Sequence, residues 1–386
     1  MHLHIYGDRY ILRTQSIRAD FSESQFKIIK AFFVSKNIDD TVHLLLGNQN
    51  VDEFTYKKIY SKINNFILDL SSKFGEDIFS PKSKLSISGE EGKFYPRVLN
   101  IELTNYCNFK CGHCYKEADN LKRQFLDFSI IEEICGKFKD KVQLIHLTGG
   151  EPLSHPEINK IIKTLHKNNF LINITTNGSL YSRLSTSSLE SINNFQISLY
   201  GCDHRTYQTT AKNDSFDTVI NFINYLESIN KNYDIGLTIN RLYIENHDKY
   251  NSLLNKLNYK NIVFSFAEAA GRCLYSDNNI WSLSDDEKTL ATNYIQQILN
   301  INHPSDNTEN YSCDAGTLSY SINEYGEVRL CQVLMSKFFA IGGLDKIIQR
   351  SIKNNFSICK QLQKYSHSLT PMCRYYYQYS LGENSK

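Results

Sequence analysis

Short apolar segments alternate with longer amphipathic ones through the middle of the chain, from about residue 97 to residue 270. Six of the apolar segments have the length and composition of β-strands: RVLNIEL (97–103), VQLIHLT (142–148), LINITT (171–176), FQISLY (195–200), IGLTIN (235–240) and NIVFSF (261–266). The chain between consecutive strands is long enough for a helix, although the third and fourth strands lie close together in the sequence. Such alternation is typical of a parallel sheet covered on its outer face. The pattern therefore predicts an α/β fold with a partial, TIM-like (β/α)6 barrel (97–270), in which chemistry sits at the carboxyl ends of the strands.

The pattern differs at both ends of the chain. Residues 1–90 predict a small α+β domain, because HLHIY and RYILR flank a tight turn at Gly7-Asp8. Ser22 and Gln25 then have the spacing of a capping box, and a second long helix is expected over roughly 52–74. GEEGKFYPR (89–97) has the composition of a linker. A third part (300–386) holds a predicted hairpin through SYSINEYGEVRL and an aromatic run, RYYYQY.

Composition and charge narrow the possible partners. The chain has 386 residues, of which 41% are hydrophobic, so it can bury a sizeable core. Its net charge of +2 gives no electrostatic reason to expect nucleic acid or a membrane surface. No long uncharged apolar run and no signal-peptide core are found in the sequence. Ten cysteines without an export signal favour a reducing cytoplasm, where thiols serve metal or redox chemistry.

Three of these cysteines lie within eight positions, directly after the first predicted strand. They are Cys107, Cys111 and Cys114, in CNFKCGHC. Their spacing suits three corners of a cubane iron–sulfur cluster, whose fourth iron would stay open for a cofactor or substrate. The alternative is a zinc site completed by His113 or by a distant residue. TGGEP follows the second strand directly, so both loops are expected at the same mouth of the barrel.

Four motifs together resemble the radical SAM enzymes, and they recur in family order on the predicted strand ends. They are CNFKCGHC (107–114), LTGGEP (147–152), TTNG (175–178) and ISLYG (197–201). The resemblance implies that the three cysteines ligate a four-iron cluster and that S-adenosylmethionine (SAM) chelates its open iron. It also implies one-electron cleavage of SAM to a 5′-deoxyadenosyl radical, which takes a hydrogen atom from a substrate.

The same resemblance implies further cofactor contacts. Gly149, Gly150 and Glu151 would bind the amino group of SAM, and His113 takes the place of an aromatic residue near the adenine. Asn177 and Ser198 would contact the methionine or ribose part. Each of these two has a plainer interpretation, since Asn177-Gly178 is also an ordinary turn and Ser198 could simply cap a strand.

The C-terminal part resembles the SPASM and Twitch extensions, which carry auxiliary iron–sulfur clusters. The similarity rests on Cys313, Gly326 and Cys331, with twelve and four residues between them. A full SPASM extension would continue with a dense cysteine run, whereas this chain has tyrosines after Cys373. The prediction is one auxiliary four-iron cluster, with four ligands: Cys313, Cys331, Cys359 and Cys373.

The remaining three cysteines are assigned differently. Cys135 shares a helical stripe with Ile131 and Phe138, so it is expected in the core. Cys202 and Cys273 both follow strands, and either could replace Cys359 as a ligand.

The resemblance extends to function. Radical SAM enzymes with such extensions often modify ribosomally made peptides, and residues 1–90 look like a peptide-recognition domain that could bind a leader peptide by strand addition. The expectation is a cytoplasmic radical SAM oxidoreductase (a RiPP maturase) that forms a carbon–carbon, ether or thioether cross-link in a precursor peptide. An electron donor such as flavodoxin or ferredoxin would serve it. The alternatives are a peptide epimerase, a protein-maturing radical SAM enzyme, or a non-catalytic metal-binding module.

Overall fold

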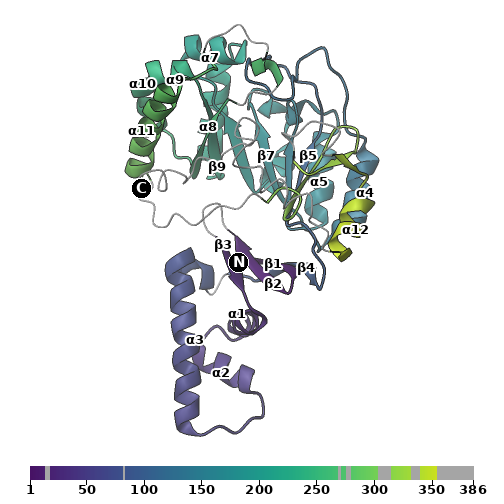
Figure 1. The fold of residues 1–386 in the computed structure, drawn as a ribbon, viewed down its shortest axis with the longest axis vertical. Helices are drawn as coiled ribbons and strands as arrows, with labels where there is room; N and C mark the ends of the chain where they lie inside the picture. The colour runs from purple at the N-terminus through teal and green to yellow at the C-terminus, as the bar shows by residue number, and fades with distance from the viewer. Residues whose placement is uncertain are drawn as a thin grey trace. The chain divides into compact units, whose positions relative to one another are not determined.

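The computed structural model describes residues 1–13, 18–80, 83–267, 271–274, 280–302, 314–331 and 340–353. The chain divides into two compact units (Figure 1). The first contains Met1–Arg97 and the short segments Asp140–Gln143 and Arg350–Asn354. The second contains Val98–Lys139 and Leu144–Gln349. Among the described helices, none combines the length and the apolar character needed to cross a membrane.

The first unit is a four-stranded sheet packed with helices. Its strands are β1 (His2–Gly7), β2 (Arg9–Arg13), β3 (Arg18–Phe21) and β4 (Ser86–Glu91), in the order β3-β2-β1-β4. The predicted hairpin is confirmed, since β1 and β2 pair antiparallel around Gly7 and Asp8. Its helices are α1 (Glu23–Ser35), α2 (Ile38–Leu46), α3 (Glu53–Phe74) and the 3-10 turn η1 (Glu76–Phe79). The Ser22–Gln25 capping box is present at the start of α1, and α3 begins after Asp52 as expected.

One prediction for this unit is wrong. The segment 89–97 is not a linker from its start, because β4 runs to Glu91 and pairs in parallel with β1. β4 is an edge strand, and most of its side chains are exposed or half-buried. An edge strand of this kind has the polar composition of a linker, so composition could not distinguish the two.

His4 is buried in this sheet as a neutral side chain. Its Nε2 donates to the carbonyl oxygen of Tyr95 at 2.8 Å, so Nδ1 accepts from the Ser88 hydroxyl at 2.9 Å. No solvent reaches the side chain, and burial lowers its pKa to about 4. The folded unit therefore disfavours the protonated imidazole.

We expect the first unit to become less stable in acid because of His4. Between pH 6.5 and pH 4 the unfolded chain binds a proton that the folded chain does not, so stability falls as the pH falls. The loss amounts to about 1.4 kcal/mol per pH unit at most. Hydrogen exchange of β1 amides, corrected for intrinsic rates, should show less protection at pH 5 than at pH 7. His4→Asn should reduce this difference, whereas His166→Asn, at an exposed position, should not. An equal pH response in His4→Asn would show that another group is responsible.

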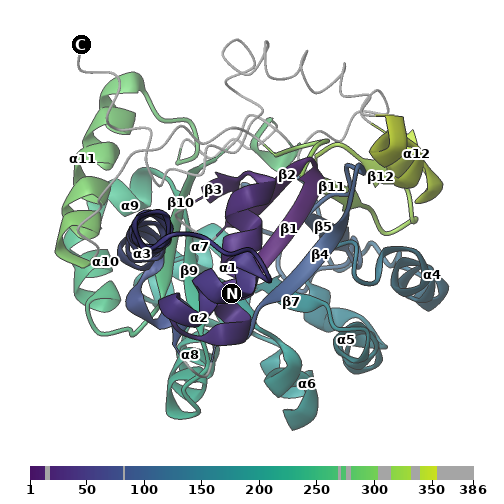
Figure 2. The same ribbon diagram turned by 90° about the horizontal axis from the view of Figure 1, so that it is seen from below.

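The second unit contains the predicted barrel. Six strands lie in parallel and in chain order: β5 (Val98–Glu102), β6 (Leu144–Thr148), β7 (Leu171–Thr176), β8 (Asn194–Ser198), β9 (Tyr233–Ile239) and β10 (Asn261–Phe266). Helices follow the strands along the outer side of the curved sheet (Figure 2): α4 (Phe128–Phe138), α5 (Ile158–Lys167), α6 (Thr186–Ser191), α7 (His204–Ala211), α8 (Phe216–Ser228), α9 (Arg241–Glu245), α10 (His247–Leu254) and α11 (Asp285–Asn302). The predicted fold class is confirmed.

The two faces of this sheet differ in character. Alternate strand residues such as Ile101, Ile145 and Ile172 are fully buried. Their neighbours on the other face are polar: His146 bonds Asn100 at 3.1 Å and Thr175 at 2.7 Å, which links β5, β6 and β7. Polar inner residues held in this way leave the carboxyl ends of the strands free to present loops. Cys135 is buried on α4, as predicted.

The C-terminal extension continues the barrel sheet. The predicted hairpin is present as β11 (Ser319–Ile322) and β12 (Val328–Arg329), and β13 (Ala340–Gly342) and α12 (Asp345–Lys353) follow. β11 pairs in parallel with β5, so the sheet has the order β10-β9-β8-β7-β6-β5-β11-β12-β13. The Asn100 amide reinforces this junction by donating to Ser319 Oγ at 2.8 Å. The first barrel strand is therefore an interior strand.

Candidate functional site

The three-cysteine loop follows β5 and is partly enclosed by the protein. Cys107 and Cys111 are buried, and Cys114 is half-buried. Backbone N–H groups already point at two of the sulfur atoms: Phe109 donates to Cys107 and Ala118 donates to Cys114, each at 3.4 Å. Burial, followed by the neighbouring Cys114, raises the pKa of Cys111 to about 12, so this thiol keeps its proton when no metal is bound.

This donor set fits an iron–sulfur cluster. Thiolates hold such clusters, and N–H groups directed at sulfur tune them. Metal binding would replace the protons of the buried thiols, because thiolates are the ligands. Among the described residues, no three His, Cys, Asp or Glu side chains gather closely enough to hold a single metal ion.

The loop after β6 lies with its backbone directly against the cysteine-loop segment. Gly150 N donates to Thr104 O at 2.7 Å, and Glu151 N donates to Tyr106 O at 2.8 Å. A Cβ atom on Gly149 would lie 2.6 Å from Thr104 O, and one on Gly150 would collide with Tyr106 O. Gly149 also has a φ of +136°, which side chains rarely adopt. Both glycines are therefore required for the two loops to meet.

Glu151 connects this loop to the end of β7. Its carboxylate accepts hydrogen bonds from Leu153 N at 2.9 Å, Thr176 Oγ1 at 2.7 Å and Asn177 N at 2.8 Å. Burial raises the pKa of Glu151 to about 7, although these three bonds favour the charged form. A carboxylate has about four lone-pair sites, so about one remains for the ammonium group of a cofactor.

Asn177 brings the β7 loop to the first cysteine. Its Nδ2 donates to Asn108 Oδ1 at 3.0 Å and lies 3.9 Å from Cys107 Sγ. Its Oδ1 accepts from Ser179 N at 2.9 Å, as in an ordinary Asx turn. Asn177 therefore forms a turn and also contacts a sulfur atom, so the two interpretations of this residue are compatible.

Ser198 and His113 each lie beside aromatic side chains at the site. Ser198, the last residue of β8, lies near Tyr200, and Tyr200 in turn lies near Cys111. The His113 ring lies 5.6 Å from Tyr200 and 4.6 Å from Trp281, between centroids. The residues that the sequence predicted for the cofactor thus lie on neighbouring loops, or, for Ser198, at the end of a strand, and Tyr200 and Trp281 lie beside His113.

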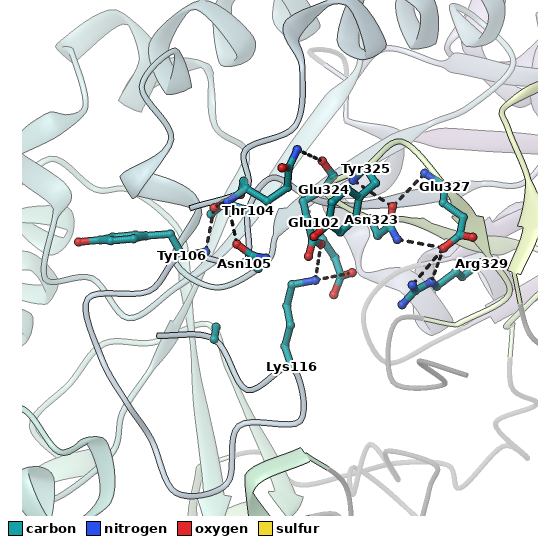
Figure 3. A network of polar contacts seen from close by, with 12 residues as sticks. Glu102, Thr104, Asn105, Tyr106, Lys116, Asn323, Glu324, Tyr325, Glu327 and Arg329 are labelled. Carbon is teal, nitrogen blue, oxygen red and sulfur yellow. Dashed lines mark hydrogen bonds and ion pairs between the residues drawn. The ribbon is translucent and has the colours of Figure 1, made fainter. Parts of the chain in front are cut away.

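The sequence did not predict a buried charge network behind the cysteine loop. Lys116 Nζ donates to Glu102 Oε2 at 2.9 Å and to Glu324 Oε2 at 2.6 Å (Figure 3). The three side chains are only 2%, 0% and 8% exposed. Burial alone would lower the pKa of Lys116, but the two carboxylates outweigh it and raise the pKa. The network ties the cysteine loop to β5 and to the β11–β12 turn. The only signal in the sequence is a lysine two residues after Cys114.

The predicted auxiliary site is described only in part. Cys331 follows β12 and is half-buried. The other three predicted ligands, Cys313, Cys359 and Cys373, lie outside the described residues. Of the two alternative ligands, Cys202 is buried with its sulfur 3.6 Å from Thr206 Oγ1, and Cys273 lies in the 3-10 turn η4 (Gly271–Leu274) after β10.

Comparison with known proteins gives three findings. Residues 101–256 match the model of the Radical SAM superfamily. Over 184 residues, the chain is 30% identical to a GTP 3′,8-cyclase of Campylobacter jejuni, covering 44% of this chain and 55% of that protein. A GTP 3′,8-cyclase of Staphylococcus carnosus is 29% identical over 187 residues, which cover 45% and 54% of the two chains. The chain thus spans about half the length of the curated relatives it matches.

Solved structures with the same fold cover more of the chain. SuiB of Streptococcus suis, bound to S-adenosylmethionine, has a TM-score of 0.55 and 18% identity over 86% of this chain and 81% of its own. anSMEcpe with bound AdoMet has a TM-score of 0.52 and 16% identity over 72% and 89%. At such identities the likeness shows the fold alone. The match to the Radical SAM superfamily model covers residues 101–256, and the four converging motif loops lie within these residues.

Proposed function

We propose that this chain is a radical SAM enzyme that reductively cleaves SAM on a four-iron cluster held by Cys107, Cys111 and Cys114. The observation that carries the proposal is the chain of contacts from Cys107 through Asn177 to Glu151, which unites three motif loops. When bound, the cluster and SAM supply a 5′-deoxyadenosyl radical. The protein holds the thiolates, directs N–H groups at them and offers Glu151 to the cofactor amino group.

We further propose a ribosomally made precursor peptide as the substrate and an intramolecular cross-link as the product. SuiB has been solved bound to the precursor peptide SuiA, and anSMEcpe with the Kp18Cys peptide. The likeness to SuiB extends over 86% of this chain, far beyond the superfamily match. A second cluster, on Cys313, Cys331, Cys359 and Cys373, and a small donor protein such as flavodoxin or ferredoxin complete the proposal.

The first unit offers a place for the peptide. Among the described strands, β3 pairs only with β2, so its other edge is open to an added strand. β4 is less open, because Gly89 N already donates to Asp140 O at 3.0 Å. Strand addition supplies affinity through main-chain hydrogen bonds, so we assign the leader peptide to β3.

A nucleotide is the second candidate substrate, because the sequence relatives are GTP 3′,8-cyclases. The two candidates separate in one experiment. Anaerobically reconstituted enzyme is reduced with SAM and given either GTP or peptides encoded by short reading frames beside the gene. We expect a mass change in a peptide and none in GTP. Consumption of GTP would replace the peptide proposal. Iron bound without any 5′-deoxyadenosine would favour a non-catalytic module, and an unchanged mass with inverted residues would indicate an epimerase.

Deleting residues 1–90 is expected to weaken binding of the precursor peptide at least about tenfold. The reason is that the main-chain hydrogen bonds to the added strand are lost. Cleavage of SAM without peptide should change little, because the cysteine loop belongs to the second unit. Fluorescence anisotropy of a labelled peptide measures the first quantity and chromatography of 5′-deoxyadenosine the second. Unchanged peptide affinity in a folded truncated protein would rule out this role for the first unit.

A further inference from the structure

The segment after β10 lies against the cysteine loop. A Cβ atom on Gly271, whose φ is +56°, would collide with the carbonyl oxygens of Cys114 and Tyr115. Arg272 N donates to Cys114 O at 3.1 Å. The main chain of η4 therefore packs on the main chain that carries the third cysteine, and this close approach fixes where the next side chain starts.

The Arg272 side chain is only partly satisfied there. Its Nη2 donates to Ala118 O, directly beside the N–H group that points at Cys114 Sγ. Its Nε and Nη1 are buried and have no hydrogen-bond partner among the described residues. A buried donor without a hydrogen bond destabilises the folded state, and a charged donor does so most. Native proteins rarely leave such donors unpaired, so these N–H groups indicate a missing acceptor.

An acidic residue of the same loop is already engaged by the backbone. Asp119 is the acidic neighbour in this loop, but its Oδ1 accepts from Leu121 N at 2.9 Å and Lys122 N at 3.2 Å. The Arg272 Nε and Nη1 atoms therefore still lack an acceptor among the described residues.

Trp281 supplies a second unpaired donor beside the cysteine loop. The side chain is 6% exposed, and its Nε1 has no partner among the described residues. A Cβ atom on Gly112, between the second and third cysteines, would lie 2.5 Å from this nitrogen. Two buried donors from one segment therefore border the stretch from Cys111 to Cys114.

We propose that Arg272 is a positioning residue for the cluster, donating its free N–H groups to thiolate or sulfide sulfur. This inference rests on the proposed function, because it needs the cluster. Three thiolates make the cluster anionic, and reduction adds one electron from the donor protein without moving a proton. A buried cation beside it stabilises the reduced form most, so Arg272 raises the reduction potential.

The test compares three variants of the full chain after anaerobic reconstitution. Arg272→Gln removes the charge and the planar fork of donors, Arg272→Lys keeps the charge alone, and Lys110→Gln removes an exposed charge in the same loop. We expect the midpoint potential, measured by redox titration with electron paramagnetic resonance, to become more negative in Arg272→Gln and less so in Arg272→Lys. Lys110→Gln should match the wild type.

A second readout does not depend on activity. Trp281 is the only tryptophan in the chain, so its fluorescence reports cluster assembly beside Gly112. We expect iron and sulfide to quench it in the wild type and to do so less completely in Arg272→Gln. SAM cleavage with a weak reductant should fall about tenfold or more.

The outcomes separate the two proposals. Wild-type protein that assembles no cluster overturns the proposed function itself. Wild-type protein with a cluster, but Arg272→Gln with the same potential and the same quenching, overturns the inference alone. Should Arg272→Gln not fold, Arg272→Lys is judged by the same criterion, because it lacks the planar donor fork.

Discussion

Replacing Cys107, Cys111 and Cys114 together with alanine is expected to abolish SAM cleavage completely and to leave the proposed auxiliary cluster in place. The two sets of cysteines belong to loops far apart in the chain, and each cubane holds about four irons. Reconstituted wild-type protein should therefore contain about eight irons and the variant about four. Iron and sulfide analysis gives these numbers, and chromatography of 5′-deoxyadenosine measures cleavage.

Cys135→Ala is the matched control, since this cysteine is equally buried but packs among apolar side chains of α4. It should keep both clusters and full cleavage. A triple variant that still makes 5′-deoxyadenosine would refute the assignment of the primary cluster. Wild-type protein with about twelve irons would refute the single auxiliary cluster, and one with about four would make Cys313, Cys331, Cys359 and Cys373 structural thiols.

Lys116→Met should destabilise the second unit by about 3–5 kcal/mol, the usual cost of leaving buried charge without its partner. The ammonium group is the shared partner of Glu102 and Glu324, and no water reaches Glu102 to replace it. Denaturant unfolding followed by the fluorescence of Trp281 measures the loss, because this residue packs on the cysteine loop within the same unit.

Two variants test the explanation by charge balance. Glu324→Gln leaves one lysine with one carboxylate, so we expect a markedly smaller loss than in Lys116→Met. Lys288→Met breaks an exposed pair with Asp285 in the same unit, whose side chains are 50% and 101% exposed, and should cost less than about 0.5 kcal/mol. Equal losses in Lys116→Met and Glu324→Gln would mean that packing, rather than charge, accounts for the effect.

Local patterns predicted most of the barrel. β7 and β10 begin and end at the predicted residues. The capping box at Ser22 is a contact between residues three apart, which spacing alone specifies. Hydrogen-bond partners within one short segment can therefore be predicted from the sequence.

Contacts between segments far apart in the sequence could not be predicted in the same way. Nothing near Lys116 indicates that Glu324 lies beside it, and nothing near Cys114 indicates Arg272. The motif residues were predicted to share one mouth because parallel strands present their carboxyl ends together. Which atoms meet there depends on loop backbones, as at Gly150, and periodicity carries no information about these.

The pairing of β11 with β5 has a consequence for how the chain folds during synthesis. Asn100 and Ser319 are 219 residues apart in the chain. At about 5–20 residues per second, the ribosome therefore reaches β11 roughly 10–45 s after it has made β5. Throughout that interval β5 can pair with β6 on one side only, and its other edge is open to neighbouring chains. Slowed translation or a stop before Ser319 would prolong this exposure and favour aggregation, even though all six barrel strands had been made.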